Sequence, residues 1–378
     1  MSNKYIFIDD RVNMLDNIVR RLNSFNQVEI KAVSIKKFND MIDYISDNID
    51  TIDGIILDLR LDEEPIDGGE GTARYKAPAL ALELRTLAAE TETGQRKLKD
   101  LPIVLCSTDE NIKAIYKNEN ASHGAFDIRF MKNDTDNFEV ISKQLKCLIE
   151  GYKVITEKKD KVGEILSIDE SYIDKNLISK FKDKTPLTHN LAQIILKDLI
   201  FSTGLLIDKN MLIAKLGLDF EASEDKHSLI DDIFENAKYN GVFSDGWERW
   251  WLPKIIEIFK EKTDVSLVQI DASSRVEKLK ECTTYKQLVV ATPITKSFSN
   301  RFWTYCQGYK AELDEIKPLD PLDGFKIVQD RDHQSWHEYE YISFKALRER
   351  YGKDKGVKLH SSEKDRYSIM KEADNGGN

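Results

Sequence analysis

The chain has 378 residues and a formal net charge of −10 at neutral pH. This length is enough for two hydrophobic cores, so we expect two domains. The negative charge excludes a general attraction to nucleic acid or to anionic membranes. The 4 cysteines show no Cys-x-x-Cys spacing, which argues against a disulfide framework and a zinc knuckle. Because no apolar run is long enough to span a membrane and no signal-peptide pattern is present, we expect a cytoplasmic protein without a membrane partner.

The first 150 residues alternate strand-like and helix-like segments. Strands are predicted at residues 5–9, 28–34, 53–58, 102–107 and 126–131, and helices at 12–24, 36–48, 74–90, 110–118 and 135–152. This rhythm predicts an α/β fold: a flavodoxin-like, doubly wound, five-stranded parallel sheet in the order 2-1-3-4-5, covered by helices on both faces.

Four of these strands end in residues suited to a functional site. The first runs into Asp9 and Asp10, the third into Asp58, the fourth into Ser107 and the fifth into Lys132. Because ligands of parallel α/β sheets bind beyond the carboxyl ends of the strands, we expect these side chains to meet at one edge. The three carboxylates are hard oxygen ligands that suit Mg²⁺, and they repel one another unless a cation is bound. With the metal in place, Asp58 can attack a phosphoryl group whose oxygens Ser107 and Lys132 contact.

In these residues and their order, the first 150 residues resemble the receiver domain of two-component response regulators. The resemblance implies a Mg²⁺ site in which the carboxylates of Asp10 and Asp58 and the backbone carbonyl of Arg60 bind the metal directly, and Asp9 acts as a further acidic ligand largely through water. It implies that Asp58 accepts the phosphoryl group, that Ser107 and Lys132 contact it, and that a histidine kinase is the partner.

The chain departs from the family pattern at positions that bear on regulation. A longer acidic loop follows Asp58, and a second insertion lies at about residues 90–100. Arg129 stands where the family has its aromatic switch residue. In the family, the positions of Arg60 and Asp109 flank the route of the attacking water, so we expect the two to pair and to regulate the lifetime of the phosphoryl group.

The remaining residues predict a second domain of different character. We assign residues 1–151 to the receiver domain, 152–185 to a connector, 186–351 to a C-terminal interaction or output domain, and 352–378 to a flexible tail. The C-terminal domain is expected to be mainly α or α+β, with helices at 191–200, 209–216 and 227–239 and a turn or β-wing at 241–251. This order weakly resembles a winged helix-turn-helix, the domain through which many response regulators bind DNA.

Charge and aromatic residues leave the role of that domain open. The helix expected at residues 227–239 carries Asp231, Asp232 and Glu235. Because phosphate contacts need net positive charge, we favour protein contacts over DNA. The three tryptophans between residues 247 and 251 either anchor an interface or pack in a core.

The leading hypothesis is therefore a response regulator that accepts phosphate from a histidine kinase. It would relay, switch or drain the signal through contacts with an effector protein or a second receiver. By architecture alone, the chain also resembles the phosphate-buffering receiver protein of bacterial phage-defence two-component systems. The alternatives are a DNA-binding transcriptional regulator and an enzyme in the C-terminal half, although no nucleophile elbow, P-loop or Gly-rich dinucleotide loop is present.

Overall fold

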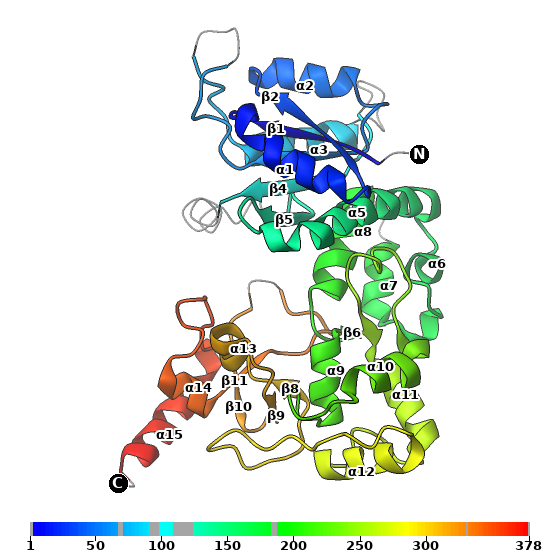
Figure 1. Cartoon of the computed structure of the whole chain (residues 1–378), viewed down its shortest axis with the longest axis vertical. Helices are drawn as coiled ribbons and strands as arrows, with labels where there is room; N and C mark the ends of the chain where they lie inside the picture. The colour runs from blue at the N-terminus through cyan, green and yellow to red at the C-terminus, as the bar shows by residue number, and fades with distance from the viewer. Residues whose placement is uncertain are drawn as a thin grey trace. The chain divides into compact units, whose positions relative to one another are not determined.

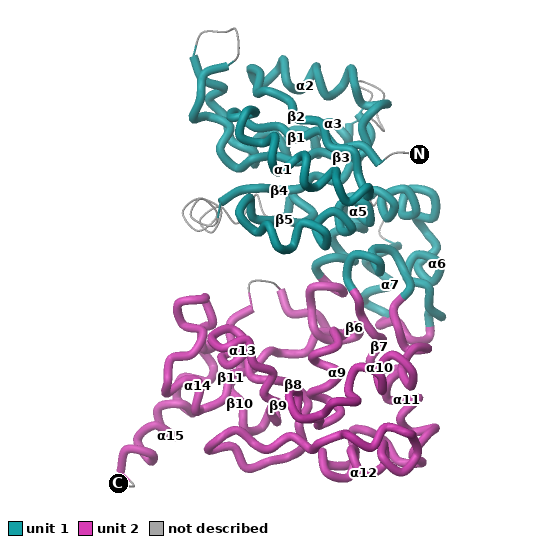
Figure 2. The backbone as a smooth tube through the Cα atoms, in the orientation of Figure 1, with its two compact units in different colours: residues 1–170, 175–197, 240–247 teal, residues 171–174, 198–239, 248–378 magenta. Residues whose placement is uncertain are grey.

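The computed structural model describes residues 3–66, 71–90, 98–108, 124–182, 187–329 and 332–376. The chain divides into two units (Figure 2). Unit 1 comprises residues 1–170, 175–197 and 240–247, and unit 2 comprises residues 171–174, 198–239 and 248–378. Each unit therefore takes up segments from both halves of the sequence.

Unit 1 is built on a five-stranded parallel sheet in the order β2-β1-β3-β4-β5 (Figure 1). The strands are β1 Lys4–Asp9, β2 Glu29–Ser34, β3 Gly54–Asp58, β4 Ile103–Ser107 and β5 Ile128–Met131. The register places Ile8 beside Leu57, and Asp58 beside Cys106. The strand order confirms the predicted flavodoxin-like sheet.

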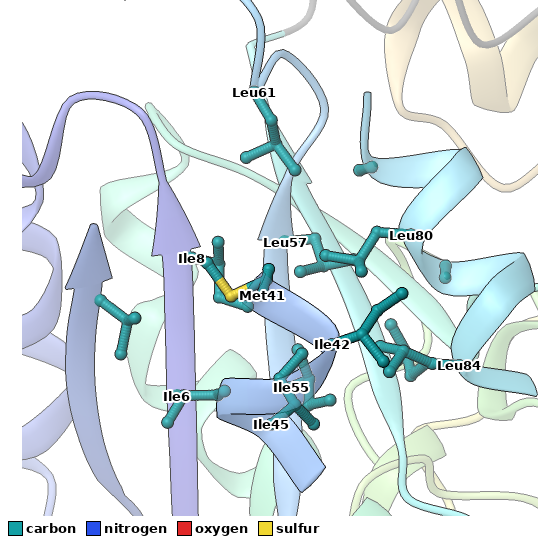
Figure 3. Close-up of a cluster of buried hydrophobic side chains, with 14 of the residues drawn as sticks. Ile6, Ile8, Met41, Ile42, Ile45, Ile55, Leu57, Leu61, Leu80 and Leu84 are labelled. Carbon is teal, nitrogen blue, oxygen red and sulfur yellow. The ribbon is translucent and has the colours of Figure 1, made fainter. Parts of the chain in front are cut away.

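Helices cover both faces of this sheet. On one side α1 Val12–Ser24 packs with α5 Phe138–Lys158, and on the other α2 Phe38–Asp47 packs with α3 Ala77–Glu90. Strand alternation explains the two layers. Ile6 and Ile8 of β1 join the cluster that contains α2 and α3 side chains (Figure 3), whereas Tyr5 donates its hydroxyl to the Leu145 carbonyl of α5. The helix predicted at residues 110–118 lies outside the described residues.

The segment predicted as a connector is largely helical. Helix α5 continues through Lys158, and α6 Val162–Leu166 and α7 Lys175–Phe181 follow, while α8 Thr188–Gln193 begins after the predicted connector. Leu177 and Phe181 are fully buried. Their spacing of four residues places both on one face of α7, so this short helix packs its apolar side inward.

The helix predicted at residues 191–200 changes type along its length. Helix α8 ends at Gln193, and a π-helix, Ile194–Ile200 (η6), continues the segment. A π-helix bonds each carbonyl to the amide five residues on and is rare. The passage from unit 1 to unit 2 between Lys197 and Asp198 falls inside it.

Unit 2 is mostly helical, as predicted for a mainly α or α+β domain. Its α-helices are α9 Lys209–Leu216, α10 Lys226–Ile233, α11 Leu252–Thr263, α12 Ala272–Cys282, α13 Gln307–Leu313, α14 Phe344–Glu349 and α15 Lys364–Gly376. Its short strands are β6 Leu206–Ile207, β7 Trp250–Trp251, β8 Thr304–Tyr305, β9 Pro318–Leu319, β10 Gly324–Lys326 and β11 Tyr341–Ser343. They form antiparallel pairs β6-β7, β8-β9 and β10-β11.

Local signals explain several of these elements. Asp208 caps α9 by accepting a hydrogen bond from the Met211 amide, and Gly217 ends the helix with φ +77°. The helix predicted at residues 227–239 is shorter: α10 ends at Ile233, and a 3₁₀ turn follows. Trp250 and Trp251 are each 1 % exposed, so these two tryptophans pack in the core.

The end of the chain also carries structure. In α15, Tyr367 packs edge-on against Phe325 at 5.9 Å, and Arg366 donates to the carbonyls of Leu322 and Gly324. These contacts did not follow from its charged composition, and the flexibility of this tail stays a prediction. None of the described helices is long and apolar enough to cross a membrane.

Candidate functional site

Three carboxylates meet at the carboxyl edge of the unit 1 sheet. Asp9 ends β1, Asp10 follows it, and Asp58 ends β3, which pairs with β1. One carboxylate oxygen from each lies within 4.8 Å of the others. Parallel strands end at the same edge, so side chains more than forty residues apart in the sequence become neighbours.

A lysine from β5 neutralises part of this charge. Lys132 follows β5, and its amide donates to the Ser107 carbonyl at the end of β4. Its Nζ lies 2.7 Å from Asp9 Oδ2 and 3.0 Å from Asp58 Oδ1. Burial by itself lowers the pKa of Lys132, but the carboxylates of Asp58 and Asp9 reverse this and raise it. The side chain therefore stays charged and bridges two of the three acids.

Burial sets the chemistry of Asp58. Only 5 % of this residue is exposed, and this burial raises its pKa to about 6. Lys132 opposes the shift, and Asp9 adds to it. A partly desolvated carboxylate next to other acids is a group whose charge is stabilised by a bound cation.

The hydroxyl of Ser107 is the unexplained polar group of the site. Its Oγ is fully buried and has no hydrogen-bond partner among the residues that the structure describes. A buried hydroxyl without a partner costs roughly 1–3 kcal/mol, so such groups call for an explanation. A ligand oxygen bound at this strand edge would supply the missing partner.

The acidic loop after β3 closes over one of the acids. Asp10 Oδ2 accepts hydrogen bonds from the amides of Glu63 and Glu64, both at 2.9 Å. Arg11 forms ion pairs with the side-chain carboxylates of Glu63 and Glu64, at 2.9 and 3.2 Å. The sequence identifies this loop as an insertion after Asp58, and its contact with Asp10 is seen only in the structure. The sequence signal that could have indicated this contact is the acidic run Asp62-Glu63-Glu64, which follows the third strand as Asp9 and Asp10 end the first.

The predicted regulatory residues have mixed outcomes. Arg60 pairs with Asp62 at 2.9 Å and with Glu63 at 3.2 Å. Asp109 lies outside the described residues, so its pairing with Arg60 stays a prediction, as does the role of the Arg60 carbonyl as a metal ligand. Arg129 is exposed on β5, where it stands beside Leu105.

The donor set fits a hard divalent cation. Among the described residues, no hydrogen bond reaches Asp10 Oδ1 or Asp58 Oδ2. The site thus offers carboxylate oxygens without competing donors, next to a hydroxyl that also lacks a partner. Oxygen ligands of this kind are those that Mg²⁺ prefers.

The strand order and the acidic edge together decide the fold of this part of the chain. The N-terminal five-stranded sheet with its flanking helices has the fold of a response-regulator receiver domain. Solved receiver domains match it at low identity. One from Clostridium thermocellum is 12% identical with a TM-score of 0.28, over 40% of this chain and 98% of its own. The chemotaxis regulator CheY4 of Vibrio cholerae is 12% identical with a TM-score of 0.25, over 39% of this chain and 99% of its own.

A third match is the receiver domain of the Saccharomyces cerevisiae regulator Ssk1, crystallised with the histidine phosphotransfer protein Ypd1. It is 11% identical with a TM-score of 0.28, over 39% of this chain and 90% of its own. These likenesses concern the receiver fold and assign no role to individual residues. No protein-family model matches the chain, and no curated protein does.

Proposed function

We propose that this protein is a response regulator whose receiver domain accepts a phosphoryl group on Asp58 from a histidine kinase or phosphotransfer protein. The observation that carries the proposal is the pairing of the acidic cluster with the partnerless buried hydroxyl of Ser107. Carboxylates alone are common on protein surfaces. A buried hydroxyl beside them, with nothing to bond, indicates that an oxygen-bearing ligand belongs there.

The transfer requires little covalent chemistry from the protein. A carboxylate oxygen of Asp58 attacks phosphorus, an O–P bond forms, and the bond from phosphorus to the donor nitrogen breaks with its electron pair leaving on that nitrogen. Asp9, Asp10 and Asp58 would hold Mg²⁺, which would supply positive charge to neutralise the phosphoryl oxygens. Lys132 transfers one of its ion pairs to a phosphoryl oxygen, and Ser107 donates its hydroxyl to another.

We propose that unit 2 acts through protein contacts. Its elements β6, α9, α10 and β7, with Lys238 bridging to Trp250, follow the order of a winged helix. Asp231 on α10 pairs with Lys209 at 2.7 Å. The remaining carboxylates on and after α10 would repel a phosphate backbone. The DNA-binding alternative predicts a nanomolar, sequence-specific duplex complex with a steep salt dependence, and our proposal predicts none.

The physiological setting belongs to the same proposal. We place the protein in the cytoplasm, where it would relay, switch or drain phosphate through an effector or a second receiver. A role in bacterial phage defence rests on the architecture-level resemblance alone. A gene neighbourhood that pairs a histidine kinase with an effector would support it, and a divergent promoter would favour transcriptional control.

Phosphate labelling tests the central claim. Incubation with acetyl phosphate and Mg²⁺ should add one labile phosphoryl group, measured by intact mass, and EDTA should suppress it. Asp58→Ala should remove the label, while Asp40→Ala, an exposed acid on α2, should retain it. Equal labelling of the Asp58→Ala protein would refute the assignment.

A further inference from the structure

One continuous helical segment, residues 188–200, passes from unit 1 into unit 2. It consists of α8 and the π-helix η6, and the units change at Lys197/Asp198. Hydrogen bonds hold this segment at both ends. In unit 1, side chains of α8 bond to residues just before β5. In unit 2, side chains from elsewhere in the unit bond to backbone carbonyls of the segment.

The receiver end is organised by Asp127, the buried residue directly before β5. Its carboxylate accepts hydrogen bonds from the Ile103 amide at 2.8 Å, Arg85 at 3.0 Å, the Tyr152 hydroxyl at 2.7 Å and Gln193 at 3.1 Å. Burial alone would raise the pKa of Asp127, but the Arg85 charge, the His189 ring and the Tyr152 hydrogen bond hold it well below its usual range. Asp127 is thus a fixed anion that joins β4, β5, α5 and α8.

His189 adds a second attachment from α8. Its Nε2 lies 2.7 Å from the Gly124 carbonyl, so this nitrogen carries a proton and donates it. Its Nδ1 lies 3.0 Å from the Tyr152 hydroxyl, and its amide donates to Asp100 at 2.6 Å. These hydrogen bonds attach the first turn of α8 to the residues just before β5, so a shift of those residues would move the turn with them.

The other end of the segment is held within unit 2. The Asp198 carbonyl accepts hydrogen bonds from Trp336 Nε1 at 2.9 Å and from His337 Nε2 at 2.8 Å. The Ile200 carbonyl accepts one from Arg249 Nε at 2.7 Å. In an α-helix the Asp198 carbonyl would bond to the amide four residues on. Both carbonyls lie in the last turn of the π-helix, where a helix leaves its carbonyls without intrahelical partners, so these side chains cap the C-terminal end of the segment.

Strand β5 links this segment to the site. Lys132, which bridges Asp9 and Asp58, follows β5, and Asp127 precedes it. A strand paired along its length moves as a unit, so a displacement of Lys132 shifts Asp127. The family's aromatic switch position is occupied here by the exposed Arg129, whereas Asp127 at the base of β5 is buried in the core.

We propose that β5, Asp127 and the α8–π-helix segment form an output lever, which carries a change at the phosphoryl site into unit 2 by shifting the π-helix between π and α hydrogen bonding. One-residue register changes of this kind give a packed helix two discrete states. Coupling of this kind is reciprocal, so a change at either end alters the other. The input at Asp58 rests on the proposed function; the mechanical coupling does not.

The first arm of the test uses the full chain without ligand. Tyr152→Phe removes the hydroxyl that joins Asp127 to His189, and Gln193→Ala removes the α8 donor without touching Tyr152. Tyr75→Phe is the matched control, because its hydroxyl donates to the Lys36 carbonyl and not to the Asp127 cluster. Hydrogen exchange at residues 198–207 should rise about tenfold in both lever variants and stay unchanged in the control. Unchanged exchange there in both lever variants would overturn the proposal.

The second arm adds Mg²⁺ and beryllium fluoride, which mimics a phosphoryl group. In the wild type, exchange should change at residues 54–58 and also at residues 194–207 and 332–343. In Tyr152→Phe and Gln193→Ala the change should remain at residues 54–58 and be lost from the distant segments. An undiminished distant change in the variants would refute the lever. A wild type that shows no change at residues 54–58 would refute the proposed function, while the first arm still decides the coupling.

Discussion

A substitution at Ser107 should affect phosphorylation without lowering the stability of the protein. Its hydroxyl is buried without a partner among the described residues, so Ser107→Ala removes a desolvated polar group. We expect the free energy of unfolding to stay level or to rise by about 1 kcal/mol, while acetyl phosphate labelling slows about tenfold. Denaturant unfolding and labelling kinetics measure the two effects.

Ser142→Ala is the matched control for this prediction. Ser142 is equally buried, but its hydroxyl donates to the Leu22 carbonyl at 3.2 Å. Loss of that bond should cost about 1 kcal/mol and leave labelling unchanged. A Ser107→Ala protein that is destabilised as much as Ser142→Ala, with normal labelling, would assign Ser107 a structural role.

Lys215 in unit 2 predicts a pH dependence of stability. This side chain is fully buried, with Nζ 2.7 Å from Glu338 and 2.8 Å from the Trp303 carbonyl. Burial lowers the pKa of Lys215 to about 8, although Glu338 opposes the shift. In the unfolded chain the value is about 10.4. Between these values the unfolded state binds more protons, so this group makes stability rise with pH by about 3 kcal/mol in total.

Lys215→Met should remove this rise. The wild-type unfolding free energy minus that of the variant should increase between pH 8 and pH 10, followed by fluorescence of the four tryptophans in unit 2. Lys209→Met removes a lysine from the same helix that is paired with Asp231 at its surface, and should keep the rise. A pH-independent difference for Lys215→Met would contradict the assignment.

The residues of the acidic edge could be foreseen because each ends a strand with a clear apolar pattern. Asp127 could not, since its partners Tyr152 and Gln193 come from helices 25 and 66 residues away. The residues that flank Asp127 in the sequence do not show whether its carboxylate is buried or lies at the surface at the end of a strand. Only the packed arrangement of β5, α5 and α8 shows which groups share it.

Among the elements, α5 and the loop at residues 240–247 fit each other closely. A Cβ at Gly151 would lie 2.2 Å from the Phe243 ring, and Phe243 itself has φ +70°, in the left-handed region that bulky side chains avoid. The loop belongs to unit 1 although its neighbours in sequence belong to unit 2. The aromatic ring therefore occupies the space that the missing side chain leaves on α5.

Gly151→Ala should destabilise the protein despite better helix propensity. Alanine gains up to about 1 kcal/mol in a helix interior, but displacing the Phe243 ring should cost more, for a net loss of about 2 kcal/mol. Adding Phe243→Gly, which removes both the ring and the backbone strain, should recover part of the loss. Additive effects in this double-mutant cycle, measured by denaturant unfolding, would rule out the contact as the cause.

The π-helix marks the limit of element prediction. The apolar pattern at residues 191–200 correctly indicates a buried helix. The C-terminal end of the segment is capped by Trp336, His337 and Arg249, which lie far along the chain and bond to two of its carbonyls. Periodicity carries no information on such partners.

For the whole molecule, the main feature is how often the chain crosses between the two units. The chain passes from one unit to the other at 170/171, 174/175, 197/198, 239/240 and 247/248. Composition indicated a single connector at residues 152–185, because charge runs look alike whether or not the helices around them pack. The domain boundaries drawn from sequence stay a prediction.

Limited proteolysis tests this organisation. A receiver joined by one flexible connector would release a stable fragment of about the first 150 residues. We expect no such fragment to accumulate, because unit 1 also needs residues 175–197 and 240–247 for its packing. Mass spectrometry of a trypsin time course, at protease levels that leave most of the chain intact, measures the outcome. A persistent receiver-sized product would contradict it.

The crossings between the two units also limit how the receiver can be exchanged, by recombination or by engineering. Recombination that joined a foreign receiver at residue 151 would separate Asp127 from Tyr152, His189 and Gln193. The graft would leave the buried Tyr152 hydroxyl and the Gln193 amide without their acceptor, at a cost of about 1–3 kcal/mol for each unsatisfied group. Homologues should therefore vary at residues 124–127, 152 and 189–193 together, and exchanges of signalling input should preserve both halves as one block.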